Sequence, residues 1–318
     1  MYLIGDVGGT KTRLTIIDKI YINSNQSYRY LKQKTKFFNT PQKYEDFLGL
    51  IFKFLKKLRK RIDKVCFGFA GNFDLDKEKL IYSPNLKDYI DRDLKKDLER
   101  ILHSCQSVVL ENDAALAGLG EAYYGAGKNF NVFGYITLGT GVGGVKIIKR
   151  ELMQTGREQM QTKFFIDDNV FGFEPGHSFI LICGINGSGH RMNGINGKDA
   201  SANSVKSVLS PLYQIEVEEI IGGKSLEKIF KKKPEKIKNK KLLDDMSKIL
   251  AIFLINVSIF WSVDKIILGG GLTKSLNFKK LNFYVNEFHP LPIKIKIIKS
   301  KLGEFAGLFG GLNYIKNF

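Results

Sequence analysis

Cysteine is scarce in this sequence, and the few cysteines do not form pairs. Cys66, Cys105 and Cys183 are scattered over 318 residues without a CxxC motif. This pattern excludes a disulfide framework and favours a reducing compartment. The longest hydrophobic run, residues 249–260, is interrupted by polar side chains and is shorter than a bilayer requires. The chain begins without a basic segment and cleavage site, so we expect a cytoplasmic protein with no secretory signal and no membrane partner.

Acidic residues are few relative to basic ones. The chain contains 32 Asp and Glu against 50 Lys and Arg, a formal net charge of +18 at pH 7. Such an excess can indicate a polyanionic partner. However, the densest basic runs, residues 53–61 and 231–241, lack the pattern of interleaved aromatic residues that stacks on bases. Solvated helix faces or loops explain these runs, so we expect no nucleic-acid partner.

The opening stretch of the chain predicts a β-hairpin with an unusual turn. Two short apolar runs rich in β-formers flank residues 6–12, DVGGTKT. Gly8 and Gly9 allow main-chain N–H groups to approach an anion, and the hydroxyls of Thr10 and Thr12 add donors. A carboxylate at Asp6 beside such a cradle suits a hydrated Mg²⁺. Taken alone, the stretch is equally consistent with an ordinary Gly-Gly hairpin.

Strand and helix patterns alternate after the hairpin, which predicts an α/β protein. The first part of the chain predicts, in order, strand, helix, strand, helix and strand at residues 29–38, 42–61, 64–69, 92–104 and 107–111. Near Asn112 the pattern begins again, because a helix and a strand lead to a second Gly/Thr turn at residues 139–144. Later helices are expected at 217–230, 241–262 and 305–315. The repeat suggests two related domains facing one nucleotide, and the length suffices for two cores.

Five motifs occur in the same order as in a known family. They are residues 6–11 (DVGGTK), 111–115 (ENDAA), 137–144 (TLGTGVGG), 174–177 (EPGH) and 264–271 (DKIILGGG). The sequence thereby resembles the ROK family of sugar kinases and repressors. The resemblance implies the two-domain α/β fold of actin-like and hexokinase-like ATPases, with RNase H-like repeats around a central cleft. We expect one domain at 1–112, completed by a C-terminal helix at 305–318, and a second at 113–304.

The resemblance implies a Mg-ATP site. Phosphate oxygens would be held by residues of the two turns and the adenosine by a backbone segment, at Gly8, Gly9, Thr10, Lys11, Gly139, Thr140, Gly141, Gly269, Gly270 and Gly271. Magnesium would be held through water near Asp6. Without the other motifs, the triple glycine would indicate only a strand-to-helix turn, and Lys11 would be an ordinary solvated lysine.

The resemblance also implies a sugar site. Asp113, where a strand ends and a helix begins, would be the general base, although helix N-capping is the alternative role for an aspartate there. The other expected sugar contacts are Asn112, Glu174, His177, Glu218, Gly71 and Asn72, with Glu219 as an alternative to Glu218. Family regulators carry a helix-turn-helix before the first hairpin. Since this chain begins on the strand itself, we expect a kinase, and the family also suggests a homodimer.

The family's zinc element is incomplete in this sequence. Many members follow the Gly-His pair with a Cys-x-Cys-Gly-x-x-Gly-Cys element, of which only Cys183 is present. Together with His177 and His190 it is poor evidence for a closed four-ligand site, so we expect no zinc. The favoured function is an ATP-dependent kinase acting on the primary hydroxyl of glucose. An N-acetylhexosamine kinase, a fructokinase and a non-catalytic sugar-responsive regulator are the alternatives.

Overall fold

The computed structural model describes residues 1–18, 27–56, 61–103, 105–153, 160–167, 175, 179–183, 212–231, 236 and 239–317. These residues form two five-stranded sheets. The first has the order β3-β2-β1-β4-β7, with β1 (Tyr2–Val7), β2 (Lys11–Ile17), β3 (Lys36–Asn39), β4 (Lys64–Phe69) and β7 (Ser107–Asn112). Its β1, β4 and β7 are parallel, whereas β2 and β3 continue the sheet in antiparallel fashion.

The second sheet repeats this topology. Its order is β10-β9-β8-β13-β14, with β8 (Val132–Leu138), β9 (Val142–Met153), β10 (Met160–Ile166), β13 (Lys265–Gly269) and β14 (Lys296–Lys299). Again one antiparallel hairpin, β8 and β9, is extended on one side by an antiparallel strand and on the other by two parallel strands. The predicted repetition of the strand, Gly/Thr turn and strand unit is therefore present in the fold.

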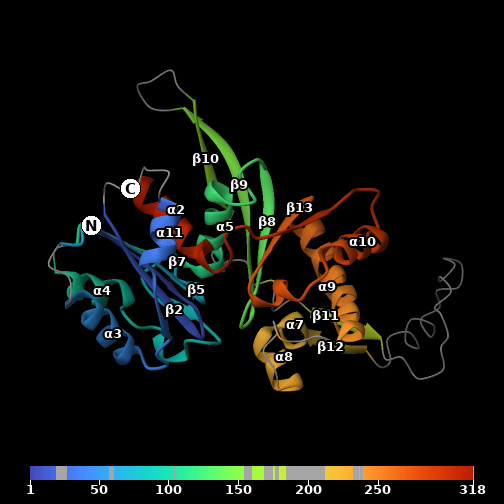
Figure 1. Ribbon diagram of the computed structural model, residues 1–318, viewed down its shortest axis with the longest axis horizontal. Helices are drawn as coiled ribbons and strands as arrows, with labels where there is room; N and C mark the ends of the chain where they lie inside the picture. The colour runs from blue at the N-terminus through green and yellow to red at the C-terminus, as the bar shows by residue number, and fades with distance from the viewer. Residues whose placement is uncertain are drawn as a thin grey trace, which may run out of the picture.

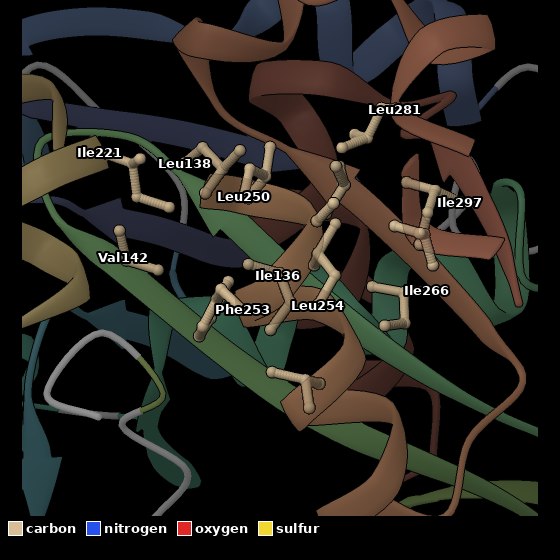
Figure 2. Close-up of a cluster of buried hydrophobic side chains, with 14 of the residues drawn as sticks. Ile136, Leu138, Val142, Ile221, Leu250, Phe253, Leu254, Ile266, Leu281 and Ile297 are labelled. Carbon is tan, nitrogen blue, oxygen red and sulfur yellow. The ribbon is translucent and has the colours of Figure 1, made fainter. Parts of the chain in front are cut away.

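Three layers of helices alternate with the two sheets (Figure 1). The outer face of the first sheet packs on α3 (Tyr44–Lys56) and α4 (Leu94–Leu102), and α5 (Asp113–Tyr124) and α11 (Ala306–Asn317) lie between the sheets. The second sheet is covered by α9 (Lys240–Trp261) and α10 (Phe278–Phe288), whose apolar side chains meet those of β8 and β13 in the core shown in Figure 2. Successive side chains of a strand point to opposite faces of the sheet. Leu3 of β1 therefore belongs to the core formed with α3 and α4, whereas Ile4 belongs to the central core formed with α5 and α11.

Short elements complete the described part of the chain. They are α2 (Ser27–Lys34), β5 (Asn72–Phe73), β6 (Leu80–Tyr82), η1 (Lys87–Tyr89), β11 (Phe179–Cys183), β12 (Leu212–Glu216), α7 (Val217–Ile221), α8 (Gly223–Phe230), η4 (Gly271–Lys274) and η5 (Gly303–Phe305). No helix in the described ranges combines the length and the apolar character needed to cross a membrane. The proposed domain boundaries at 112/113 and 304/305 stay a prediction.

Two expected elements differ from the structure. The predicted strand over 29–38 is wrong in its first part, because residues 27–34 form α2 and only 36–39 form β3. Leu31 is fully buried in the central core, so tertiary packing determines this short polar segment. The predicted helix over 217–230 is divided, because the chain is extended at Gly222, with ψ of 138°. Neither α10 nor β14 was predicted.

Candidate active site

A cleft of about 590 Å³ lies where the parallel strands of both sheets end. Residues that line it follow the carboxyl ends of β1, β4 and β7 in one sheet and of β8, β13 and β14 in the other. Ligands of α/β proteins bind at the carboxyl ends of parallel strands, and pockets for small molecules measure roughly 300–1,000 Å³. The cleft therefore has the position and the size of a ligand site.

The two Gly/Thr turns meet across this cleft. The Oγ1 atoms of Thr10 and Thr140 are 3.2 Å apart, although the residues are 130 positions apart in the chain. Each turn is closed by its own backbone, from Gly8 N–H to the Lys11 carbonyl and from Gly139 N–H to the Gly141 carbonyl, both at 3.0 Å. The glycines leave main-chain groups accessible, so the paired turns offer several donors to one anion.

Lys11 lines the cleft, and a residue of the neighbouring strand fixes its ammonium group. Its Nζ atom donates to Asn39 Oδ1 at 3.0 Å, and neighbouring β3 therefore fixes the ammonium group at the edge of the first turn. Thr40, which follows β3, donates from its hydroxyl to the Gly8 carbonyl at 2.7 Å. The first turn is thus supported by residues about 30 positions further along the chain.

The triple glycine also lines the cleft, together with the segment 299–307. Gly270 has φ of +87°, a conformation that favours glycine, and a Cβ atom there would lie 2.7 Å from the Leu138 nitrogen. Gly269 lies over the hydroxyl of Tyr135, a buried residue whose pKa is raised by burial. Gly270 and Gly271 are partly exposed and carry no side chain, so their backbone lines this part of the cleft directly.

Asp113 is the first residue of α5 and lines the cleft. The helix cap is Asn112, whose Oδ1 accepts the Ala115 N–H at 3.0 Å, so N-capping does not account for the aspartate. One carboxylate oxygen of Asp113 accepts the N–H of Ala114 at 2.8 Å. Asn112 Nδ2 donates to the Gly71 carbonyl at 2.9 Å, which joins two residues expected at the sugar site.

Asp6 is buried at the base of the cleft beside an arginine that motif analysis did not identify. Arg13 donates to its carboxylate at 3.0 Å and lies 3.6 Å from Glu304. Burial raises the pKa of Asp6, whereas the positive charge of Arg13 lowers it. The raised pKa means that the charged form is only partly compensated, so a further cation nearby would stabilise it. This environment is compatible with a hydrated Mg²⁺ close to Asp6.

Glu218 also reaches the cleft, but from α7. Its Oε2 accepts the Val142 N–H at 2.8 Å and lies against Gly141, so the carboxylate borders the second turn. Glu219, the alternative, is exposed. Whether Glu218 contacts a sugar stays a prediction, because its contact in this structure is with the turn expected to bind phosphate.

Asn72 does not line the cleft, and several other predicted residues fall outside the described part of the chain. Asn72 lies on β5, one position beyond the cleft-lining Gly71. Glu174 and His177 fall outside the described residues, although Pro175 between them is buried against Gly144 of β9. His190 and the side chain of Cys183 also fall outside, and the described part of the chain contains no group of three or more His, Cys, Asp or Glu side chains able to hold a metal.

The structure adds cleft residues that motif analysis missed. The Ser83 hydroxyl donates to the Ala70 carbonyl and accepts the Leu86 N–H. These two bonds fix the turn at residues 83–86, in which Asn85 packs against Gly9. The Ser-Pro-Asn sequence was an available turn signal. Lysines also border the cleft, at Lys32, Lys274, Lys299 and Lys301. No local pattern marks these lysines, since they resemble the many others in the chain.

Two sheets of the same topology around a cleft at their strand ends define the class of protein. This is the two-domain α/β fold of the actin-like and hexokinase-like ATPases. The chain belongs to the ROK family, whose family model matches residues 3–164 and 215–317. The family resemblance seen in the motifs is thereby confirmed, and so is the predicted fold class.

Comparison with known proteins gives distant relatives over most of the chain. It is 26% identical to a glucokinase from Aeropyrum pernix over 264 residues, 79% of each chain. It is 24% identical to an N-acetylmannosamine kinase from Haemophilus influenzae over 315 residues, 98% of this chain and 94% of the relative. A ROK family glucokinase from Streptomyces griseus, solved with glucose and AMPPNP, has a TM-score of 0.64 at 21% identity and covers 100% of this chain and 99% of that one. Such a structural likeness shows the fold alone.

Proposed function

We propose that this protein is an ATP-dependent kinase that phosphorylates the primary hydroxyl of a hexose, with glucose as the favoured substrate. The observation that carries the proposal is that Asp113 lines the same cleft as both Gly/Thr turns. A base and donors for phosphate oxygens therefore face one cavity, as phosphoryl transfer requires. Membership of the ROK family and similarity to a glucokinase support it.

In this proposal Asp113 is the general base. It accepts the proton of the primary hydroxyl as that oxygen bonds to the γ-phosphorus and the bond from phosphorus to the β–γ bridging oxygen breaks, which releases ADP. The hydroxyls of Thr10 and Thr140 and the N–H groups of their turns donate to phosphate oxygens. Magnesium supplies charge neutralisation when it is bound with the nucleotide, and Asp6 would hold it through water. Asn112 orients the sugar through a ring hydroxyl.

An N-acetylhexosamine is the second candidate substrate. The N-acetylmannosamine kinase relative covers nearly the whole chain, whereas the glucokinase relative covers less of it. A hexose and its N-acetylated counterpart differ in bulk beside the ring, so the choice depends on the pocket that surrounds the ring. We therefore propose to measure ADP release from Mg-ATP with glucose, mannose, fructose, N-acetylglucosamine and N-acetylmannosamine in separate reactions. A clear preference for glucose is the expected result.

Replacing Asp113 by asparagine tests the assigned base. We expect turnover to fall by roughly 10²- to 10⁴-fold, because the amide does not accept the proton. Circular dichroism and binding of a non-hydrolysable ATP analogue should match the wild-type protein, since the substitution preserves shape. Retained turnover in Asp113→Asn would refute the assignment.

A non-catalytic regulator is the alternative that the same assay distinguishes. Folded wild-type protein that binds ATP and sugar but releases no sugar-dependent ADP would indicate a sensor. The expected homodimer, the cytoplasmic location and the absence of zinc are further proposals. Sedimentation at micromolar protein, cell fractionation and metal analysis of purified protein would test them.

A further inference from the structure

A buried carboxylate lies directly before the proposed catalytic pair. Glu111 precedes Asn112 and Asp113, and it is only 2% exposed. Its Oε2 accepts from Lys77 Nζ at 2.6 Å and from the Tyr314 hydroxyl at 2.9 Å. Its Oε1 accepts the backbone N–H of Asn112 at 2.9 Å. One side chain thus joins the end of β7, the turn between β5 and β6, and α11.

The contact with Lys77 is the one that balances the charge. A buried carboxylate is strongly disfavoured without a cation or several donors, and the ammonium group supplies both charge and a short hydrogen bond. Lys77 is itself held in an uncommon backbone conformation, with φ of +53°. The surrounding turn is fixed by Asp74, whose carboxylate accepts the N–H groups of Glu78 at 2.7 Å and Lys79 at 3.2 Å. The ammonium group is therefore presented to Glu111 by an ordered turn.

The hairpin of β5 and β6 is tied to the end of β7 at two points. At its beginning, the Gly71 carbonyl accepts from Asn112 Nδ2. At its turn, Lys77 reaches Glu111. Both attachments are made to consecutive residues of one strand end, directly before Asp113. The body of the hairpin also packs through buried Phe73 and Leu80, so losing the second attachment loosens its turn and weakens its hold on the end of β7.

We propose that Glu111 and Lys77 are positioning residues that hold the hairpin 71–82 against the proposed sugar site. The inference rests on the proposed kinase function. Neither Glu111 nor Lys77 lines the cleft, whereas Gly71 and Asn112 do, so the pair acts on the sugar through these two residues. Loosening the hairpin lowers the fraction of protein that is competent to bind sugar, which raises the apparent KM for sugar in proportion. The two Gly/Thr turns lie between other strands, and Asn85, which packs against Gly9, is fixed by Ser83 outside the hairpin, so we expect little change in nucleotide binding.

The test is a comparison of Lys77→Met with Lys79→Met. Lys79 lies in the same hairpin and pairs with Asp93 at the surface, so its substitution makes the same charge change without touching Glu111. We expect Lys77→Met to raise the KM for glucose about tenfold, with kcat and the KM for ATP changed less than about twofold. Lys79→Met should match the wild-type protein, and Lys77→Arg should restore most of the lost affinity.

Hydrogen exchange of the backbone amides over residues 72–82 provides a readout that does not depend on catalysis. We expect faster exchange there in Lys77→Met than in Lys79→Met. If the unpaired Glu111 prevents folding, the double variant Lys77→Met/Glu111→Gln removes the buried charge and should show the same rise in KM. Equal KM values for sugar in the two lysine variants would overturn the inference, even with altered exchange. Failure of the wild-type protein to phosphorylate any sugar would refute the proposed function instead, and the exchange comparison would still test the pair.

Discussion

Replacing Gly310 by alanine tests how closely α5 and α11 cross between the two sheets. A Cβ atom at Gly310 would lie 2.6 Å from the carbonyl carbon of Leu116 and closer still to its oxygen. The reciprocal contact is similar, because a Cβ atom at Gly120 would lie 3.0 Å from the carbonyl carbon of Ala306. Ordinary contact begins near 3.4 Å, so the helices must separate by at least about 0.8 Å, the difference between 3.4 and 2.6 Å.

The added Cβ atom would meet main-chain atoms, which cannot move aside by changing rotamer as a side chain can. Both helices are also packed on sheets, which limits how far they can separate. Overpacking of this kind destabilises by about 1–3 kcal/mol, and we expect the upper half of that range for Gly310→Ala. Gly49 provides the control, since it lies within α3 and a Cβ atom there would meet nothing within 4 Å. At this position alanine should stabilise by about 0.5–1 kcal/mol through helix propensity.

Urea unfolding followed by circular dichroism measures both substitutions. The same chemical change should lower the unfolding midpoint at Gly310 and raise it at Gly49. The opposite signs remove any general effect of alanine from the comparison. A Gly310→Ala protein as stable as the wild type would refute the close crossing, and destabilisation at Gly49 would refute the assumption that its surroundings are open.

Two further predictions concern carboxylates outside the cleft. Glu121 is fully buried and accepts hydrogen bonds from three backbone N–H groups and the Ser300 hydroxyl, so Glu121→Ala should lower the free energy of unfolding by about 3–5 kcal/mol. Hydrogen bonds from Lys280 and Tyr284 lower the pKa of Asp244 from 3.8 to about 2, so its stabilising effect is present above pH 4 and is lost as the pH falls toward 2. The difference in urea midpoint between wild type and Asp244→Asn should therefore shrink from about pH 6 to about pH 3, and a constant difference would contradict the assignment.

Local patterns predicted the parts of the fold that depend on local chemistry. Both Gly/Thr turns and the strand-to-helix position of Asp113 follow from residues adjacent in the chain. Contacts between distant residues were not predictable in this way, and the hydrogen bond from the Val142 N–H to Glu218 joins positions 76 apart. The pairing of Asp6 with Arg13 is different, because the hairpin register already places these residues opposite each other. The hairpin was predicted without its register, and the ion pair was missed for that reason.

The side chain of Asn112 decides between the two roles that the sequence left open for Asp113, helix cap and general base, because Asn112 itself caps α5. An amide offers two N–H donors and an oxygen with two lone pairs. Capping of α5 uses one lone pair through the Ala115 N–H, and the Gly71 carbonyl takes one donor. One donor and one lone pair are not used by these two bonds, so the same amide is able to cap the helix, fix Gly71 and meet a sugar hydroxyl. Because the cap belongs to Asn112, the adjacent Asp113 is positioned by the helix start without serving as its cap.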